Sequence, residues 1–296
     1  MKPLFTGCAT ALVTPFSEDG KIDFESLRKL IEYQIESKVD ALVISGTTGE
    51  GSTLTVSEKL ELYEFAVKTV NKRVPVIAGT GSNSTSFAID LGKEAEKTGI
   101  DAHLIVTPYY NKASQNGIIE HYYAIADEFA KPVIVYNVPT RTGVNISAET
   151  YEVLSRHDNI VAVKEADTNI NKLIRSLHLC GDKIDFYVGN DDMITIGASL
   201  GCKGVISVLS NIAPKFTVEM TRYAIEINMK RSREMQKISL ELINALFSDV
   251  NPIPVKTAMN YLDFCSDRTR LPLTKMNESQ YRNLIEIIEK YRDIIH

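Results

Sequence analysis

The feature that most constrains this fold is a repeated pair: a short, β-branched apolar run followed by a longer segment with helical periodicity. The apolar runs cover residues 7–13, 41–45, 74–79, 103–107, 133–137, 161–165, 186–189 and 204–208. The segment after the first run carries apolar residues at helical spacing, at Phe24, Leu27, Leu30, Ile31 and Ile35. Such alternation predicts an α/β protein with buried parallel strands.

Strand–helix pairs at a period of roughly thirty residues fit a closed (β/α)₈ barrel, a doubly wound open sheet or a solenoid. A barrel takes about 250 residues, and the chain has 296. The eighth strand and its helix would end near residue 225. We therefore expect residues 1–225 to form a barrel that carries the active site. Residues 226–296 are expected to form a C-terminal helical region, interrupted at Asn251-Pro252-Ile253-Pro254.

Polar residues stand at the carboxyl ends of six of these runs. They are Ser45-Gly46-Thr47-Thr48, Gly79-Thr80-Gly81, Thr107-Pro108-Tyr109-Tyr110, Tyr136-Asn137, Lys164-Glu165 and Gly189-Asn190-Asp191. Barrel enzymes build their active sites from this end of the strands. An open sheet would concentrate such residues at one switch point. The pattern favours a TIM barrel with a C-terminal helical extension.

Charge and composition argue against several classes of function. Lys and Arg number 33 against 38 Asp and Glu, a net charge of -5, so a nucleic-acid or anionic-membrane partner is not expected. The four cysteines form no C-x-x-C pair and the five histidines have no metal-ligand spacing, so we expect buried free thiols and no metal site. No apolar run reaches the about 18 residues of a membrane span, and Pro3 interrupts any signal-like stretch, so the expected location is the cytoplasm.

Local signals mark helix starts. Oxygen-bearing side chains stand where N-caps are expected, at Asp23, Ser57, Ser84, Ser147 and Asn169. The pair Asp191-Asp192 is interpreted as the cap of the following helix and not as a catalytic dyad.

Lys164 is the most informative single residue. It ends the run Ile160-Val161-Ala162-Val163, where a low-dielectric cavity would disfavour the ammonium form and lower the pKa. A neutral amine is what Schiff-base formation with a carbonyl substrate requires. The alternative is a lysine that extends outward into solvent.

Two further strand ends complete a chemical pattern. Tyr136 ends the run before Lys164, and adjacent strands lie roughly 5 Å apart, so its phenol could transfer protons for the lysine adduct. Ser45 to Gly51 form a glycine-rich turn whose N–H groups and hydroxyls could hold a carboxylate. The alternatives are a half-buried aromatic and a plain tight turn. Together the three features suggest Schiff-base chemistry on an oxo-acid.

The chain resembles the pyruvate-dependent class I aldolase family that includes N-acetylneuraminate lyase, and within it the dihydrodipicolinate synthase (4-hydroxy-tetrahydrodipicolinate synthase) branch. The resemblance covers nearly the whole length, from Gly7 to Lys256. Its motifs are Gly46-Thr47-Thr48-Gly49-Glu50, Thr107-Pro108-Tyr109-Tyr110-Asn111-Lys112, Tyr136-Asn137-Val138-Pro139-Thr140-Arg141-Thr142-Gly143, Val163-Lys164-Glu165-Ala166 and Asn251-Pro252-Ile253-Pro254-Val255-Lys256.

The resemblance implies a role for each site residue. Lys164 would form the Schiff base, and Tyr136 would donate and accept protons. Thr47 and Tyr110 would complete a proton relay, with Tyr110 reaching into a neighbouring subunit's site. The pyruvate pocket would be formed by Thr48, the backbone at Ile206 and the Gly189 carbonyl. The family's usual assembly is a homotetramer, a dimer of dimers.

Arg141 distinguishes the synthase branch from the sialic-acid lyases, which usually carry a small or apolar residue there. A guanidinium fits a carboxylate in a bidentate fork and suits L-aspartate 4-semialdehyde. The implied activity is condensation of pyruvate with that aldehyde in lysine and diaminopimelate biosynthesis, without a cofactor. The alternatives are a sugar-acid aldolase of the same family, against which Arg141 argues, and a barrel that only binds ligand, against which Lys164 and Tyr136 argue.

One departure concerns feedback inhibition by lysine, which some synthases show. The resemblance places polar and acidic residues of the inhibitor site where this chain has Val56, Lys59 and Phe87, although Asn83 and Tyr109 remain. A lysine ammonium would meet a cation and an apolar ring there, so we expect no feedback inhibition.

Overall fold

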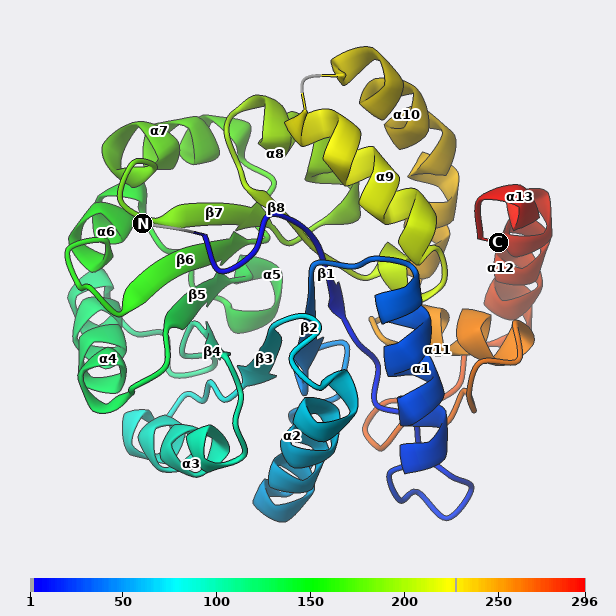
Figure 1. Ribbon diagram of the computed structural model, residues 1–296, viewed down its shortest axis with the longest axis horizontal. Coiled ribbons are helices and arrows are strands. Elements are labelled where there is room, and N and C mark those ends of the chain that lie inside the picture. The colour runs from blue at the N-terminus through cyan, green and yellow to red at the C-terminus, as the bar shows by residue number, and fades with distance from the viewer. Residues whose placement is uncertain (1–2, 227, 296) are drawn as a thin grey trace.

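Eight parallel strands follow one another around a closed barrel in chain order, and β8 pairs with β1 to complete it. The computed structural model describes residues 3–226 and 228–295 (Figure 1). The strands are β1 (Gly7–Ala11), β2 (Ala41–Ile44), β3 (Val76–Gly79), β4 (Ala102–Val106), β5 (Val133–Asn137), β6 (Ile160–Glu165), β7 (Asp185–Val188) and β8 (Gly204–Ser207). All eight predicted runs are confirmed as strands of a TIM barrel.

The first predicted run is longer than the strand it forms. It was expected to reach Val13, but β1 ends at Ala11. The cause is a change of hydrogen-bond partner, because the Val13 N–H donates to the side chain of Asn211 at 3.2 Å and not to a neighbouring strand.

Helices surround the barrel, with two short 3₁₀ turns after β7 and β8. They are α1 (Phe24–Glu36), α2 (Val56–Val70), α3 (Thr85–Lys97), α4 (Gln115–Glu128), α5 (Pro139–Thr142), α6 (Ala148–Leu154), α7 (Ile170–Cys180), η1 (Asp191–Met193), α8 (Ile194–Ser199), η2 (Leu209–Asn211) and α9 (Pro214–Ile225). The C-terminal helices are α10 (Met229–Leu246), α11 (Ile253–Tyr261), α12 (Glu278–Lys290) and α13 (Arg292–Ile295). No helix in the described part of the chain is long and apolar enough to cross a membrane.

Four of the five predicted N-caps are confirmed, and one is wrong. The side chains that accept the first free N–H groups include Asp23, Ser84, Ser147 and Asn169. Helix α2 is capped by Thr55 instead of Ser57, because Glu58, three residues after Thr55, bonds back to the Thr55 N–H and completes a capping box.

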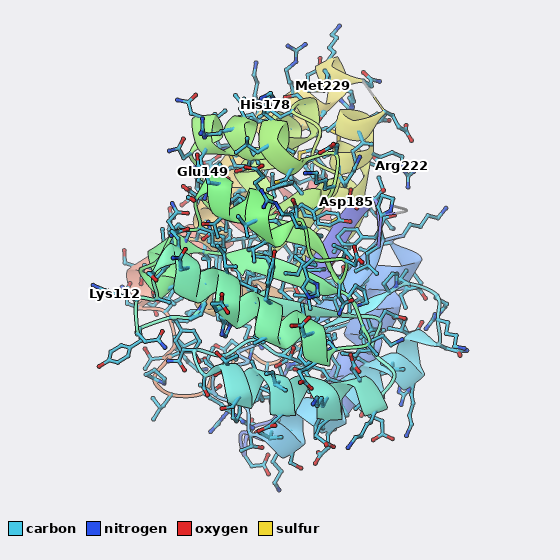
Figure 2. The ribbon with its side chains drawn as sticks, turned by 90° about the vertical axis from the view of Figure 1, so that its left-hand side faces the viewer. Lys112, Glu149, His178, Asp185, Arg222 and Met229 are labelled. Atoms are coloured by element: carbon cyan, nitrogen blue, oxygen red, sulfur yellow. The ribbon has the colours of Figure 1, made fainter. Side chains whose placement is uncertain are left out.

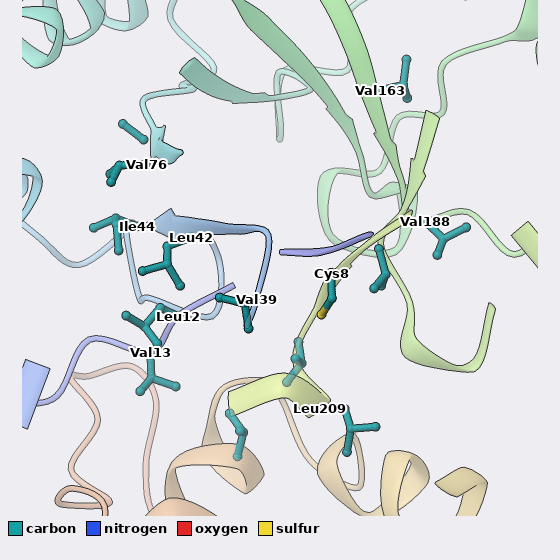
Figure 3. Close-up of a cluster of buried hydrophobic side chains, with 14 of the residues drawn as sticks. Cys8, Leu12, Val13, Val39, Leu42, Ile44, Val76, Val163, Val188 and Leu209 are labelled. Carbon is teal, nitrogen blue, oxygen red and sulfur yellow. The ribbon is translucent and has the colours of Figure 1, made fainter. Parts of the chain in front are cut away.

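Two apolar clusters lie on the two sides of the barrel wall. The outer cluster, between strands and helices, includes Cys8, Leu42 and Val163 (Figure 3). The inner cluster fills the barrel and includes Ala162 and Tyr136. Side chains of a strand alternate between the two faces, so Val163 faces outward while the residue after it faces the barrel interior. The four cysteines are all free and buried, as predicted.

The barrel has two distinct ends. Figure 2 shows it from the side, with Lys112, in the loop after β4, at one end and Asp185, at the start of β7, toward the other. The carboxyl ends of the strands, and the polar residues that follow them, all lie at the Lys112 end.

Candidate active site

Lys164 lies inside the barrel near the carboxyl end of β6. It is the direct partner of Tyr136 in the register between β5 and β6. Its side chain is buried, with 5% of the residue exposed, and its Nζ lies 4.4 Å from the centroid of the Tyr136 ring. The alternative of a lysine extending into solvent is therefore wrong, and the two side chains named as catalytic are neighbours.

Glu165, the next residue, holds this strand end in place from the opposite face. Its carboxylate accepts hydrogen bonds from Asn137 at 2.7 Å and Tyr151 at 2.8 Å, and it pairs with Lys172 at 2.9 Å. Burial, with the adjacent Glu165 carboxylate, raises the pKa of Tyr151 well above its ordinary value, so this phenol stays a proton donor. The network fixes the strand on which Lys164 stands.

The turn after β2 is tightly folded and depends on one glycine within it and another at the end of β3. Ser45 has a left-handed backbone, φ 57°, and its carbonyl oxygen approaches two glycines closely. A Cβ at Gly51 or Gly79 would lie 2.2 or 2.3 Å from that oxygen, so no other residue fits at either position. The turn that results presents Thr47 and Thr48 at the carboxyl end of the barrel, as expected.

A cavity of about 470 Å³ opens at this end of the barrel. Three of the residues predicted for the site line it: Thr47, Tyr136 and Arg141. Lys164 is not among the lining residues, but its Nζ lies 4.4 Å from the ring centroid of Tyr136, which is. The cavity therefore joins the loop that carries Arg141 to the phenol that contacts the lysine.

The residues that the resemblance assigns to a pyruvate pocket are more deeply buried. Thr48 is 2% exposed and Ile206 is fully buried in the inner cluster. Gly189 adjoins the lysine, since a Cβ there would lie 3.1 Å from Lys164 Cε. A side chain at Gly189 would therefore displace the amine.

Tyr110 is not brought to this cavity. Its side chain is 89% exposed, and its backbone is left-handed with φ 74°. Within one chain, the proton relay implied by the resemblance is therefore incomplete.

The interpretation of Asp191 as the cap of the following helix is wrong, since no side chain of the described residues caps α8. Its buried carboxylate accepts hydrogen bonds from the Ser207 hydroxyl and from the N–H groups of Val208, at 3.0 Å, and Leu209, at 2.9 Å. It thereby binds the loop after β8, the strand that contains Ile206. Burial raises the pKa of Asp191, although these hydrogen bonds lower it in part.

The C-terminal region completes the cavity, which the sequence did not indicate. The residues it contributes to the lining are Val250, Asn251, Pro252, Pro272 and Leu273. From the sequence, the Asn-Pro-Ile-Pro segment is predicted to interrupt the helices and belongs to a motif of the family resemblance, but no side chain of it is predicted to line the site. The preference of Pro for helix starts was the available signal, because Pro252 and Pro254 introduce α11.

A buried ion pair anchors α11 to the barrel. The Lys256 ammonium is 2.7 Å from Glu50 Oε1 and also donates to the Thr14 carbonyl at 2.9 Å. Glu50 belongs to the glycine-rich turn, and its other oxygen accepts from the Arg270 N–H at 2.9 Å. Burial lowers the pKa of Lys256, and the Glu50 carboxylate opposes that shift. The pair links the turn that carries Thr47 and Thr48 to the segment that closes the cavity.

Replacing Lys256 with Met is expected to lower the free energy of unfolding by about 3–5 kcal/mol, because Glu50 keeps a buried charge without its partner. Urea unfolding measures this change. Lys68→Met is the matched control, since the Lys68–Glu64 pair is exposed and should contribute less than about 1 kcal/mol. Equal effects of the two substitutions would contradict an anchoring role for the buried pair.

No group of three or more His, Cys, Asp or Glu side chains that could hold a metal ion occurs among residues 3–226 and 228–295.

Comparison with known proteins places this geometry in a family. A family model for the dihydrodipicolinate synthetase family matches residues 4–291. A 4-hydroxy-tetrahydrodipicolinate synthase of Lachnoclostridium phytofermentans is 50% identical over 97% of this chain and 98% of its own length. The dihydrodipicolinate synthase structure from Aquifex aeolicus has a TM-score of 0.95 at 41% identity, over 98% of this chain and 99% of that one.

A chloride-inhibited dihydrodipicolinate synthase from Acinetobacter baumannii, solved in complex with pyruvate, also has a TM-score of 0.95, at 40% identity, and covers 98% of this chain and 99% of its own. Sequence and structure thus agree over nearly the whole length. The chain belongs to the dihydrodipicolinate synthetase family.

Proposed function

We propose that this chain condenses pyruvate with L-aspartate 4-semialdehyde to give 4-hydroxy-tetrahydrodipicolinate in lysine and diaminopimelate biosynthesis. The observation that carries the proposal is the contact between the buried Lys164 amine and the Tyr136 ring, at 4.4 Å, in which the ring belongs to a side chain that lines the same cavity as Arg141. Family membership and the pyruvate complex of the Acinetobacter baumannii relative support the choice of the first substrate.

In the proposed reaction, the neutral amine of Lys164 attacks the ketone carbon of pyruvate, and the carbinolamine loses water to give an imine. The imine accepts the electron pair left when a methyl proton departs, so an enamine forms without a cofactor. The enamine carbon attacks the aldehyde carbon. The amine of the second substrate then displaces Lys164 as the ring closes, which regenerates the free lysine.

Each remaining residue has a proposed part in this sequence. Tyr136 donates and accepts the protons of the carbinolamine, because its phenol ring lies against the amine. Thr47 passes protons to Tyr136, together with Tyr110. Thr48, the backbone at Ile206 and the Gly189 carbonyl hold pyruvate.

We further propose that the active form is a homotetramer, a dimer of dimers, in the cytoplasm. The exposure of Tyr110, at 89%, supports a partner subunit that receives this side chain. A second set of exposed apolar side chains supports another contact between subunits: Ile170 and Ile174 on α7, and Ile196 on α8. Sedimentation velocity measures the assembly, and a monomer at assay concentration would contradict it.

Lysine is not expected to inhibit the enzyme. Lys59 is 92% buried on α2, its ammonium has no hydrogen-bond or ion-pair partner among the described residues, and burial lowers its pKa. Phe87, 43% exposed, lines the same cavity. A lysine ammonium would meet a cation and a ring instead of a carboxylate, and a buried pair of like charges is strongly disfavoured.

The rate of condensation should therefore stay constant in a dose series up to millimolar lysine, measured at subsaturating pyruvate. A saturable fall in rate across that series would contradict the proposal. The rate at zero lysine tests the proposed condensation, and the change in rate across the series tests inhibition by lysine. The two predictions can therefore fail separately.

The substrates are tested in one comparison. A coupled assay with pyruvate and L-aspartate 4-semialdehyde is expected to show turnover, while cleavage of N-acetylneuraminate is expected to be absent. Cleavage of the sugar acid without condensation would overturn the proposal in favour of a lyase of the same family.

A further inference from the structure

The geometry points to Asn251 as a positioning residue for the pyruvate subsite: its side-chain amide directs the Thr48 hydroxyl proton toward the substrate carboxylate. Asn251 stands between α10 and α11, lines the cavity and is 94% buried. The inference rests on the proposed function and extends it to the C-terminal region.

Two contacts join Asn251 to residues that are distant in sequence. Its Nδ2 donates to Thr48 Oγ1 at 3.0 Å, across 203 residues of chain. Its main-chain carbonyl accepts from Arg141 Nη2 at 3.0 Å, across 110 residues. One residue thus contacts both groups proposed to bind substrate carboxylates.

The contact with Thr48 decides where the hydroxyl proton points. A hydroxyl has one proton to donate and two lone pairs that accept. The amide N–H occupies one lone pair, so the proton is turned away from Asn251. No acceptor for that proton is found among the described residues, which leaves it for a carboxylate oxygen of the substrate.

An asparagine with a purely structural role would have hydrogen-bond partners for both the nitrogen and the oxygen of its side-chain amide, and Asn251 does not. Asn251 Oδ1 is buried and has no hydrogen-bond partner in the described part of the chain. A buried acceptor without a partner is destabilising, and most buried amides avoid that arrangement. The arrangement here is therefore explained by what the nitrogen does at Thr48.

The segment that carries Asn251 is held firmly enough for this role. The Ile253 N–H donates to the Val250 carbonyl at 2.8 Å, and the Lys256–Glu50 pair ties α11 to the same turn that contains Thr48. The amide and the hydroxyl are therefore positioned by one connected unit.

The test is a double-substitution cycle of Asn251→Ala and Thr48→Val. Each single variant is expected to raise the KM for pyruvate about tenfold, the scale of one hydrogen bond to a charged group, with kcat changed less than about threefold. Because both act through one proton, the double variant should also show a rise of about tenfold instead of about a hundredfold.

The KM for the second substrate distinguishes a positioning role of the Asn251 amide from a general loosening of the segment that carries Asn251. Asn251→Ala keeps the main-chain carbonyl that holds Arg141, so the KM for L-aspartate 4-semialdehyde should stay within about twofold. A loosened segment would raise both KM values. Asn260→Ala is the matched control, since Asn260 lies on α11, its amide bonds to the Cys265 carbonyl just beyond that helix, and it does not line the cavity.

A further variant covers the case in which Asn251→Ala does not fold. Asn251→Asp keeps the shape, but its carboxylate accepts the Thr48 proton and repels pyruvate, so the KM for pyruvate should rise more than tenfold. An unchanged KM for pyruvate, additive effects in the cycle, or equal rises for both substrates would overturn the inference. Trapping of pyruvate by the unsubstituted protein is measured first, because its failure would reject the proposed function instead.

Discussion

Replacing Lys164 with alanine is expected to lower the rate of condensation on the order of 10⁶-fold, the scale seen when an enzyme loses its nucleophile. The reason is that the imine is the only electron sink in the proposed reaction, so no enamine forms without the amine. The rate is measured in a coupled assay at saturating concentrations of both substrates, with circular dichroism to confirm folding.

Lys203→Ala is the control for this substitution. Lys203 precedes β8 at the opposite end of the barrel, so the rate should remain within about twofold, as for a surface position away from the chemistry. A Lys164→Ala protein that retains a substantial rate would mean that the reaction proceeds without a Schiff base at this residue.

Replacing Arg141 with alanine is expected to separate the two substrates. The pyruvate adduct at Lys164 should form as before, whereas kcat/KM for L-aspartate 4-semialdehyde should fall about 10²–10³-fold, because two charge-assisted hydrogen bonds to one carboxylate are lost. Borohydride trapping measures the first quantity and the coupled assay measures the second.

Arg141 also donates to the Asn251 carbonyl at 3.0 Å, so Arg141→Lys is needed beside the alanine variant. Lysine keeps the charge and loses the bidentate fork, so it should restore only part of the activity. Arg156→Ala, which removes an exposed pair with Glu152, is the control for loss of an arginine. Unchanged turnover of the aldehyde by Arg141→Ala would show that the substrate assignment is wrong.

The sequence predicted what depends on local pattern. All eight strands were found because each apolar run is short and regular, and period-two alternation places Lys164 on the same inner face as Ala162. The pairing of Lys164 with Tyr136 followed from their position at the ends of consecutive strands. Both features can be predicted from residues close together in the sequence and from the rule that successive strands pair.

What the sequence could not predict depends on contacts between distant segments. The Asn251–Thr48 and Lys256–Glu50 contacts join residues 203 and 206 positions apart, and no local pattern encodes them. Thr55, rather than Ser57, caps α2 because the partner Glu58 decides between two similar side chains. The roles of the individual site residues stay predictions that the variants above address, and the boundary at residue 225 stays a prediction as well.

The most direct test of the central claim is the identification of the residue that carries pyruvate. The protein is incubated with pyruvate, reduced with borohydride, digested and analysed by mass spectrometry. A reduced pyruvyl group on Lys164, absent from the Lys164→Ala protein and from samples without pyruvate, is the predicted result. The absence of an adduct, or an adduct on another lysine, would contradict the Schiff-base mechanism.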